Sequence, residues 1–208
     1  MSSGADASTG SPAGARALIA AYADRAPSAE QAETARRMLA FIDAHPDCLW
    51  RTCREGHLTG SAWVVDPARR RTLLTHHRKL GKWLQLGGHA DGEEDLAAVA
   101  LREAREESGL ADVRLVTPEI FDLDAHGIPA RGQEPAHIHF DVRFLCEASA
   151  DAPLAVSDES HALAWLDLDA VSRLNPEESL LRMVRRTPPA ASRQRKAKAA
   201  RRTTNDKA

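Results

Sequence analysis

Hydrophobic residues near the start of the chain recur at the spacing of amphipathic helices. Residues 15–26 fit one short helix. Ser28 followed by Gln31 has the pattern of a capping box, which predicts that a second helix begins there and continues to about His45. We expect the two helices to form an N-terminal helical cap, residues 12–50, that packs on the main domain.

Beyond residue 55 the pattern changes to short β-rich segments and two further helices. The predicted strands cover residues 57–66, 71–77, 83–86, 112–126, 136–148 and 161–168. One helix is predicted from about Glu94 to Ser108, with Gly109 ending it. A last helix is predicted to start at Asn175, which is followed by a proline and two acids. These elements make up the main domain, residues 55–187.

The two ends of the chain differ in composition from the rest. Residues 1–11 are small and polar, and residues 188–208 are basic, so both are predicted to be disordered. The formal net charge is −2, and residues 191–208 carry seven lysines and arginines against one aspartate, which leaves −8 for the rest. An acidic body argues against a nucleic-acid-binding domain, and the basic tail is the feature that would favour a polyanion.

Cysteine usage and hydropathy bear on the compartment. Cys48, Cys53 and Cys146 are odd in number and lack C-x-x-C spacing, which argues against a disulfide framework and against a thiolate zinc site. This usage favours a reducing cytoplasm. No apolar run approaches the length of a membrane span, and the N-terminal residues lack the pattern of a secretory signal, so no membrane partner is expected.

The helix that ends at Gly109 carries its acids on an unusual face. Leu96, Val99, Ala100 and Ala104 form its apolar stripe on a helical wheel. The carboxylates of Glu103, Glu106 and Glu107 continue that stripe, at neighbouring i, i+3 and i+4 positions. Three adjacent carboxylates repel one another, so a cation should compensate them, and Mg²⁺ or Mn²⁺ fits all-oxygen ligation. The alternative is an acidic helix end neutralised by arginines.

The residues around these acids resemble a known motif. Gly88, five residues, Glu94, seven residues and then Arg102-Glu103-Ala104-Arg105-Glu106-Glu107-Ser108-Gly109-Leu110 match the Nudix box, G-x5-E-x7-R-E-U-x-E-E-x-G-U, where U is a bulky aliphatic residue. Ala104 is smaller than the usual residue, and Leu86 stands where many members have proline. The box covers residues 88–110, and the surrounding strands extend the resemblance to about 55–175.

The resemblance implies an α/β/α sandwich with a mixed β-sheet, here preceded by two N-terminal helices. It implies a hydrolase that cleaves a diphosphate linkage in a nucleoside diphosphate derivative or related organic diphosphate, by water attack on phosphorus with Mg²⁺ or Mn²⁺. Dimers are common in the family, so a homodimer is one assembly to expect.

The resemblance also assigns roles to positions in this sequence. Glu103, Glu106 and Glu107 would hold the metal with the carbonyl of Gly88, and Glu94 and Arg102 would tie the loop to the helix. The general base is open: Glu106, Glu107 and Glu159, which precedes a late tryptophan-containing strand, are the candidates.

A second polar group lies on two segments with strict alternation, residues 121–126 and 137–141. One hairpin register pairs Asp122 with Asp141, Asp124 with His139 and His126 with His137, and puts Phe121, Leu123, Ile138 and Phe140 on the opposite face. The hypothesis is that Asp124, His137 and His139 line the substrate cleft and contact phosphate or an additional metal. The alternative is a solvent-facing side of a hairpin. His89, which follows the double glycine, is a further candidate phosphate contact.

Other function classes fit less well. A catalytically silent Nudix-fold binding or regulatory module would be expected to lose box carboxylates, and this chain keeps them all. Neither a P-loop nor a dinucleotide-binding glycine motif is present around Gly87-Gly88. The identity of the diphosphate substrate does not follow from the sequence.

Overall fold

The structure is a computed structural model that describes residues 11–157 and 160–190. Most of the two predicted terminal segments, 1–11 and 188–208, and the candidate base Glu159 lie outside these described residues. Within them, no helix is both long and apolar enough to cross a membrane. Cys48, Cys53 and Cys146 are buried, and all three are free thiols.

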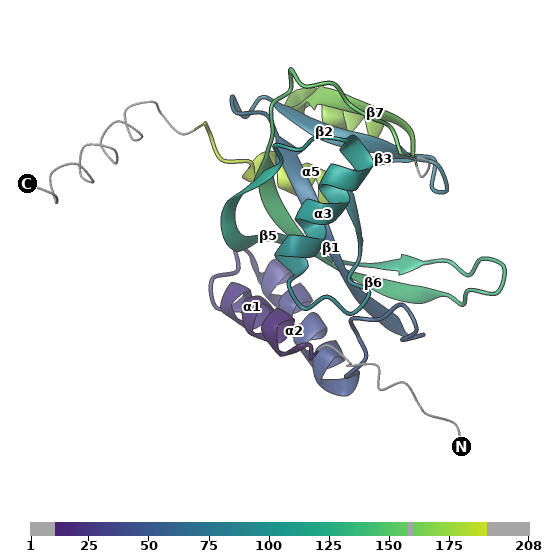
Figure 1. Cartoon of the computed structure of the whole chain (residues 1–208). Coiled ribbons are helices and arrows are strands. Elements are labelled where there is room, and N and C mark those ends of the chain that lie inside the picture. The colour runs from purple at the N-terminus through teal and green to yellow at the C-terminus, as the bar shows by residue number, and fades with distance from the viewer. Residues whose placement is uncertain (1–10, 158–159, 191–208) are drawn as a thin grey trace, which may run out of the picture.

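Seven strands form one mixed sheet (Figure 1). They are β1 (Gly56–Val65), β2 (Arg71–His77), β3 (Lys82–Leu84), β4 (Leu86–His89), β5 (Arg114–Ile128), β6 (His137–Glu147) and β7 (Ser160–Asp167). The order is β3-β2-β1-β6-β5, with β4 paired to β1 and β7 paired to β2. The β1–β6 pair is parallel and the other pairs are antiparallel. The expected α/β fold with a mixed sheet is confirmed.

Helices cover both faces of the sheet. They are α1 (Ala13–Ala23), α2 (Ala29–Ala44), α3 (Leu96–Ser108), α4 (Val171–Leu174), which follows a short 3₁₀ turn (Leu168–Ala170), and α5 (Glu178–Arg186). In Figure 1, α3 crosses one face of the sheet and α5 lies against the other, while α1 and α2 sit beside one end. The two predicted N-terminal helices are therefore present and packed on the sheet domain.

Strand β1 is the centre of the core, because all ten of its residues are buried. Its side chains alternate between two hydrophobic clusters. Leu58, Ala62 and Val64 join the cluster that includes residues of α1, α2 and α3. Trp63 and Val65 join the cluster formed with Val171 of α4 and with Leu180 and Met183 of α5. A strand covered on both faces buries successive positions, which explains the apolar run at residues 62–65, while the first half of β1 also buries the polar side chains of His57, Thr59 and Ser61.

The N-terminal helices are joined to the sheet by polar contacts as well as apolar ones. The Ser28 hydroxyl accepts a hydrogen bond from the Gln31 N–H at 3.2 Å, so the predicted cap of α2 is confirmed. The Gln31 side-chain amide then bonds both backbone groups of Leu123 in β5, at 3.0 and 3.1 Å. Tyr22 of α1 donates its hydroxyl proton to the same amide oxygen at 2.6 Å. Gln31 therefore fixes the helical cap to β5.

Several predicted boundaries were wrong. The segment around Leu86 forms two short strands, β3 and β4, and Gly88 belongs to β4 rather than to a loop. Helix α5 begins at Glu178, not directly after Asn175. The Asn175 side chain accepts a bond from the Glu177 N–H at 2.9 Å and donates to the Trp83 carbonyl at 2.9 Å, so it fixes the turn before the helix to β3.

The predicted register of the β5–β6 hairpin was also wrong, by two residues. Asp122 lies opposite Arg143, Asp124 opposite Asp141, and His126 opposite His139. The shift is even, so it leaves each side chain on its predicted face. Phe121 is the exception, because the irregularity between Ile120 and Asp122 places it in the second hydrophobic cluster, away from Leu123 and Phe140.

Candidate functional site

Helix α3 carries the acidic box residues and is fixed at both ends. Asp95 caps its start, since one side-chain oxygen accepts bonds from the N–H groups of Ala97 and Ala98 at 3.0 Å each. Gly109 ends it in the left-handed conformation with φ 72°, as predicted. The predicted apolar stripe, formed by Leu96, Val99, Ala100 and Ala104, is buried.

The three box carboxylates differ in exposure. Glu107 is 8% exposed, the Glu103 side chain is 18% exposed, and Glu106 is exposed. Glu103 lies against β4: a Cβ atom added to Gly88 would sit 2.5 Å from its carboxylate. The Glu103 carboxylate therefore lies directly against the backbone of Gly88, and a side chain at this position would displace it.

Arg102 joins the helix to β4. Its guanidinium lies 2.8 Å from Glu103 Oε1 and donates to the His89 carbonyl at 3.5 Å. These two contacts agree with the expectation that Arg102 ties the loop to the helix. The Glu94 carboxylate accepts a bond from the Ser11 N–H at 2.6 Å, and its role in tying the loop to the helix stays a prediction.

The turn between β4 and α3 is held by residues before β1. Gly92 has φ 88°, and a Cβ there would lie 2.1 Å from the Trp50 ring. Asp91 is also left-handed, with φ 47°. Its carboxylate accepts a hydrogen bond from Arg51 Nε at 2.8 Å, and that bond is the main cause of its lowered pKa. The turn is thus positioned by packing and by an ion pair.

Four histidines gather at one end of β1, β4 and β6. The ring of His57 lies 5.0 Å from that of His89, 4.9 Å from that of His137 and 4.8 Å from that of His139. Burial lowers the pKa of His57 to about 4 and that of His139 to about 2, with help from the neighbouring rings. Neutral imidazoles are poor partners for a phosphate anion and good ligands for a metal.

His57 was not singled out from the sequence. It stands near the start of β1, and only the parallel β1–β6 register, which places it opposite His139, brings it into the group. A lone histidine in such a strand carries no local signal of its partners.

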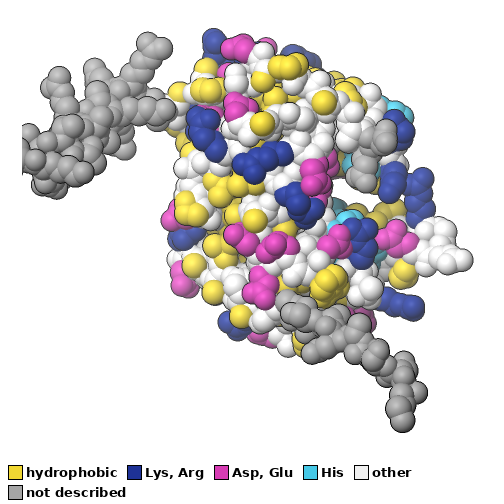
Figure 2. Space-filling model, in the orientation of Figure 1, with side chains coloured by type: hydrophobic (Ala, Val, Ile, Leu, Met, Phe, Trp, Pro, Cys, Tyr) yellow, Lys and Arg dark blue, Asp and Glu magenta, His cyan; other side chains and the backbone are white. Residues whose placement is uncertain are grey.

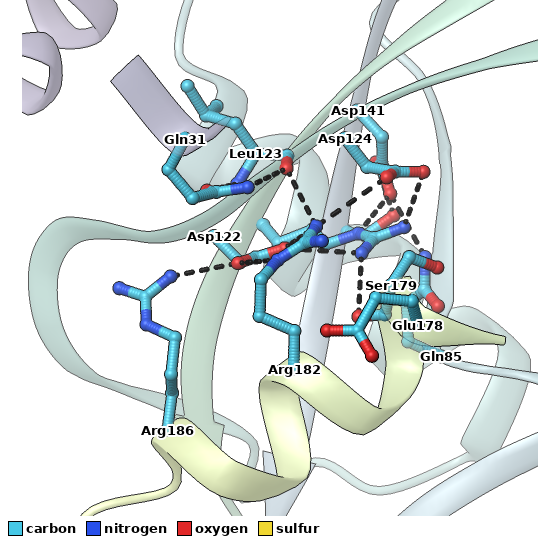
Figure 3. A network of polar contacts seen from close by, with 12 residues as sticks. Gln31, Gln85, Asp122, Leu123, Asp124, Asp141, Glu178, Ser179, Arg182 and Arg186 are labelled. Atoms are coloured by element: carbon cyan, nitrogen blue, oxygen red, sulfur yellow. Dashed lines mark hydrogen bonds and ion pairs between the residues drawn. The ribbon is translucent and has the colours of Figure 1, made fainter. Parts of the chain in front are cut away.

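The other part of the predicted polar face is a buried ion network (Figure 3). Asp122 is fully buried and binds three arginines: Arg182 at 2.9 Å through two of its nitrogens, Arg186 at 2.8 Å and Arg143 at 3.3 Å. Arg143 also lies 3.1 Å from Asp124 and 2.7 Å from Asp141. The network joins β5 and β6 to α5.

Asp141 extends the network to β1 and to the segment before β4. It accepts hydrogen bonds from Thr59 at 2.9 Å, Ser61 at 2.7 Å and Gln85 at 2.9 Å, in addition to that from Arg143. Burial alone would raise the pKa of Asp124, but its bond with His126 and the charges of Arg143 and Arg182 outweigh burial and lower that pKa to about 2. These carboxylates are engaged with arginines, so the predicted solvent-facing alternative does not describe this face.

An open pocket borders the histidines. It has a volume of about 380 Å³ and is lined by Arg51, Thr52, Arg54, Gln133 and Pro135. These residues belong to the segment before β1 and to the β5–β6 turn, whereas the hollow that Figure 2 shows between the projecting hairpin and the part of the molecule that carries β2, β3 and β7 is a separate one. The Pro135 carbonyl accepts from His137 Nδ1 at 2.9 Å, so the pocket adjoins the histidine group.

The structure thus sorts the predicted site residues into three groups. Glu103, Glu106, Glu107 and Arg102 lie on α3, with Glu103 against Gly88. His89, His137 and His139 lie together with His57. Asp124 belongs to the ion network instead.

Comparison with known proteins places this geometry in a family. The sequence model of the NUDIX domain matches residues 57–186. No curated protein sequence matches the chain. Among solved structures, a binary complex of the Ap4A hydrolase of C. elegans is 15% identical, covering 62% of this chain and 93% of its own, with a TM-score of 0.50.

Two further solved structures give similar figures. A NUDIX-family hydrolase from Clostridium perfringens is 23% identical, covering 64% of this chain and 96% of its own, with a TM-score of 0.46. The dihydroneopterin triphosphate pyrophosphohydrolase of E. coli is 16% identical, covering 61% and 91%, with a TM-score of 0.49. The family match spans more than half of the chain and contains the whole box, and from it we conclude that this chain belongs to the Nudix hydrolase family.

Proposed function

We propose that this Nudix pyrophosphohydrolase is metal-dependent and cleaves a diphosphate linkage in a nucleoside diphosphate derivative or a related organic diphosphate. Water would attack phosphorus. The observation that carries the proposal is the contact between the Glu103 carboxylate and Gly88, where a Cβ atom would come within 2.5 Å. It brings the acidic stripe of α3 against the backbone of β4.

The residues present fit a hard divalent cation. Glu103, Glu106 and Glu107 are neighbours on one helix, and Arg102 lies 2.8 Å from Glu103. Partial burial of Glu103 and Glu107 strengthens their mutual repulsion, which a divalent cation would relieve. An all-oxygen donor set suits Mg²⁺ or Mn²⁺. In this proposal the three carboxylates and the Gly88 carbonyl hold the ion.

When bound, such a cation neutralises the diphosphate oxygens and acidifies a coordinated water. The side chains of the protein would supply the general base. Glu106 is the exposed member of the three and could accept the proton of the attacking water. Glu107, and Glu159 outside the described residues, are the other candidate bases.

The pocket lined by Arg51 and Arg54 is our candidate for receiving an anionic part of the substrate. The pKa of Arg51 is raised, chiefly by its hydrogen bond to Asp91 and to a smaller extent by the charge of Glu103. The effect of Glu103 indicates that the pocket lies within electrostatic reach of the carboxylates. Two arginines beside a carboxylate-bound cation would favour a multiply charged phosphate compound.

The test compares Glu106→Gln and Glu107→Gln with the unmodified chain. Phosphate release from a panel of organic diphosphates, after phosphatase coupling, is measured with Mg²⁺ and with Mn²⁺. We expect kcat to fall by about 10²-fold or more, as when a group that stabilises developing charge is removed. Mn²⁺ binding, followed by the loss of the free-ion electron paramagnetic resonance signal, should weaken in parallel.

The matched control is Glu33→Gln, which changes an exposed glutamate on α2 and should leave kcat unchanged. Full activity in both box variants would reject them as metal ligands. A chain that binds nucleoside diphosphates yet hydrolyses none of the panel would instead be the catalytically silent module.

A further inference from the structure

Three histidines from β1 and β6 converge on one point. The parallel register places His57 directly opposite His139, and His137 lies two positions before His139 on the same face of β6. Each ring offers one nitrogen, and these three nitrogens all lie within 4.8 Å of one another. None of them belongs to the acidic stripe of α3.

The hydrogen bonds of His137 show which of its nitrogens is available. Its Nδ1 lies 2.9 Å from the Pro135 carbonyl oxygen, which can only accept, so Nδ1 carries the proton. In the neutral ring Nε2 then carries a lone pair and accepts a hydrogen bond from His139 Nε2 at 3.1 Å, and a bound cation would take the place of the proton between the two nitrogens. Two ligand nitrogens about 2.0–2.1 Å from a tetrahedral ion are roughly 3.3 Å apart, close to the distance seen.

His57 supplies the independent observation. It is only 2% exposed, yet among the described residues neither of its ring nitrogens makes a hydrogen bond. The Cys53 carbonyl acts on this ring, opposing the effect of burial on its pKa, without meeting hydrogen-bond geometry. A buried imidazole without a hydrogen-bond partner is costly, and a cation bound by one nitrogen would offset that cost.

We propose that His57, His137 and His139 bind a first-row transition-metal ion of the Zn²⁺ class. Imidazole nitrogens suit Zn²⁺ and its neighbours, whereas Mg²⁺ prefers oxygen. Three protein ligands leave a fourth position for water or a substrate atom. The bond from His137 Nδ1 to a backbone carbonyl is the usual outer support of a histidine ligand.

The histidine site adjoins the acidic stripe but differs from it in chemistry. His89 follows Gly88 in β4, and its ring lies 5.0 Å from that of His57 and 5.2 Å from that of His139. His89 is therefore a fourth imidazole next to the three proposed ligands. The nitrogen site and the oxygen site would thus select different ions, so each can be tested while the other is intact.

The experiment uses the full chain, stripped of metal by a chelator and titrated with Co²⁺ as the probe. Four-coordinate Co²⁺ absorbs visible light strongly, whereas six-coordinate Co²⁺ on carboxylates absorbs weakly. We expect a visible band that saturates at one ion per chain and is abolished by stoichiometric Zn²⁺. The band should persist in Glu106→Gln, because no carboxylate of α3 belongs to the site.

His137→Gln and His139→Gln should each weaken Co²⁺ binding by about 10-fold or more, since disrupting even the outer support of a metal ligand costs that much. The matched control is His161→Gln, an exposed histidine on β7. His139 is less buried than His137, so His139→Gln is the variant that best preserves the fold, and circular dichroism of both variants checks this.

Three results would overturn the proposal: no visible band in the unmodified chain, a band unchanged in both histidine variants of correct fold, or a thiolate-to-Co²⁺ charge-transfer band that disappears in Cys53→Ser. The last would assign the ion to the other group of neighbouring donors, His45, Cys53 and Glu55.

Discussion

The carboxylate of Asp122 is fully buried, and replacing it with asparagine tests whether the ion network stabilises the fold. Arg143, Arg182 and Arg186 all bind this one side chain. The network thus contains these three positive arginines and the three negative carboxylates of Asp122, Asp124 and Asp141. Asp122→Asn keeps the volume, removes one negative charge and leaves the network with a net positive charge.

The magnitude follows from burial. Asp122 is fully buried and Arg143 is 2% exposed, so solvent cannot replace the lost charge. Removing one partner of a buried pair costs about 3–5 kcal/mol. In a domain of this size, where 1 kcal/mol corresponds to ~2–4 °C, the melting temperature should fall by about 6–20 °C.

The assay is urea unfolding at pH 7 for the free energy and thermal unfolding for the melting temperature, each followed by tryptophan fluorescence and repeated by circular dichroism. Asp43→Asn is the control, because Asp43 also pairs with an arginine through two hydrogen bonds but both side chains are about half exposed. No resolvable loss is expected there, since water screens an exposed pair. A loss in Asp122→Asn no larger than that in Asp43→Asn would refute the claim that the buried network stabilises the fold.

Two further predictions concern the same region. The pKa of the Asp124 carboxyl is ordinarily 3.8 and is about 2 in the folded chain. The carboxylate therefore contributes about 2 kcal/mol to the free energy of unfolding above pH ~4, and this contribution is lost as the pH falls through ~2. Urea unfolding from pH 5 to pH 2 should show this dependence, and Asp124→Asn should lack it. An identical pH slope in the two chains would contradict the assignment. Gln31→Leu should destabilise the chain by about 1–3 kcal/mol in the same assay, because it leaves the buried Leu123 N–H unpaired while the Leu123 carbonyl keeps its bond from Arg182 at 3.1 Å. Exposed Gln133→Leu is its control, and equal stability of the two variants would count against the docking role of Gln31.

Local patterns predicted the elements that depend on local physics. The cap at Ser28, the apolar stripe of α3 and the left-handed end at Gly109 follow from hydrogen bonds and spacing within a few residues. The acidic stripe was predicted for the same reason, since a helix fixes the relative direction of side chains three and four positions apart.

The hairpin register could not be predicted, because an even shift leaves the faces unchanged. The sequence pattern is equally satisfied by pairing Asp124 with His139 or with Asp141. The observed register places Arg143 opposite Asp122, and that arrangement depends on Arg182 and Arg186 of α5, far along the chain.

The histidine group was only half predicted for a related reason. The alternation of residues 137–141 placed His137 and His139 on one face. The contribution of His57 depends on the parallel pairing of β1 with β6, which joins positions 82 residues apart at Thr59 and Asp141. No periodicity within either strand encodes that pairing.

The dependence of Asp122 on arginines from the last described helix has a consequence for biosynthesis. Asp122 and Arg186 are 64 residues apart, and synthesis at about 5–20 residues per second separates them by roughly 3–13 s. During that interval Asp122 has Arg143 of β6 beside it but lacks Arg182 and Arg186, two of its three arginine partners. The ion network around Asp122 is therefore complete only after α5 has left the ribosome.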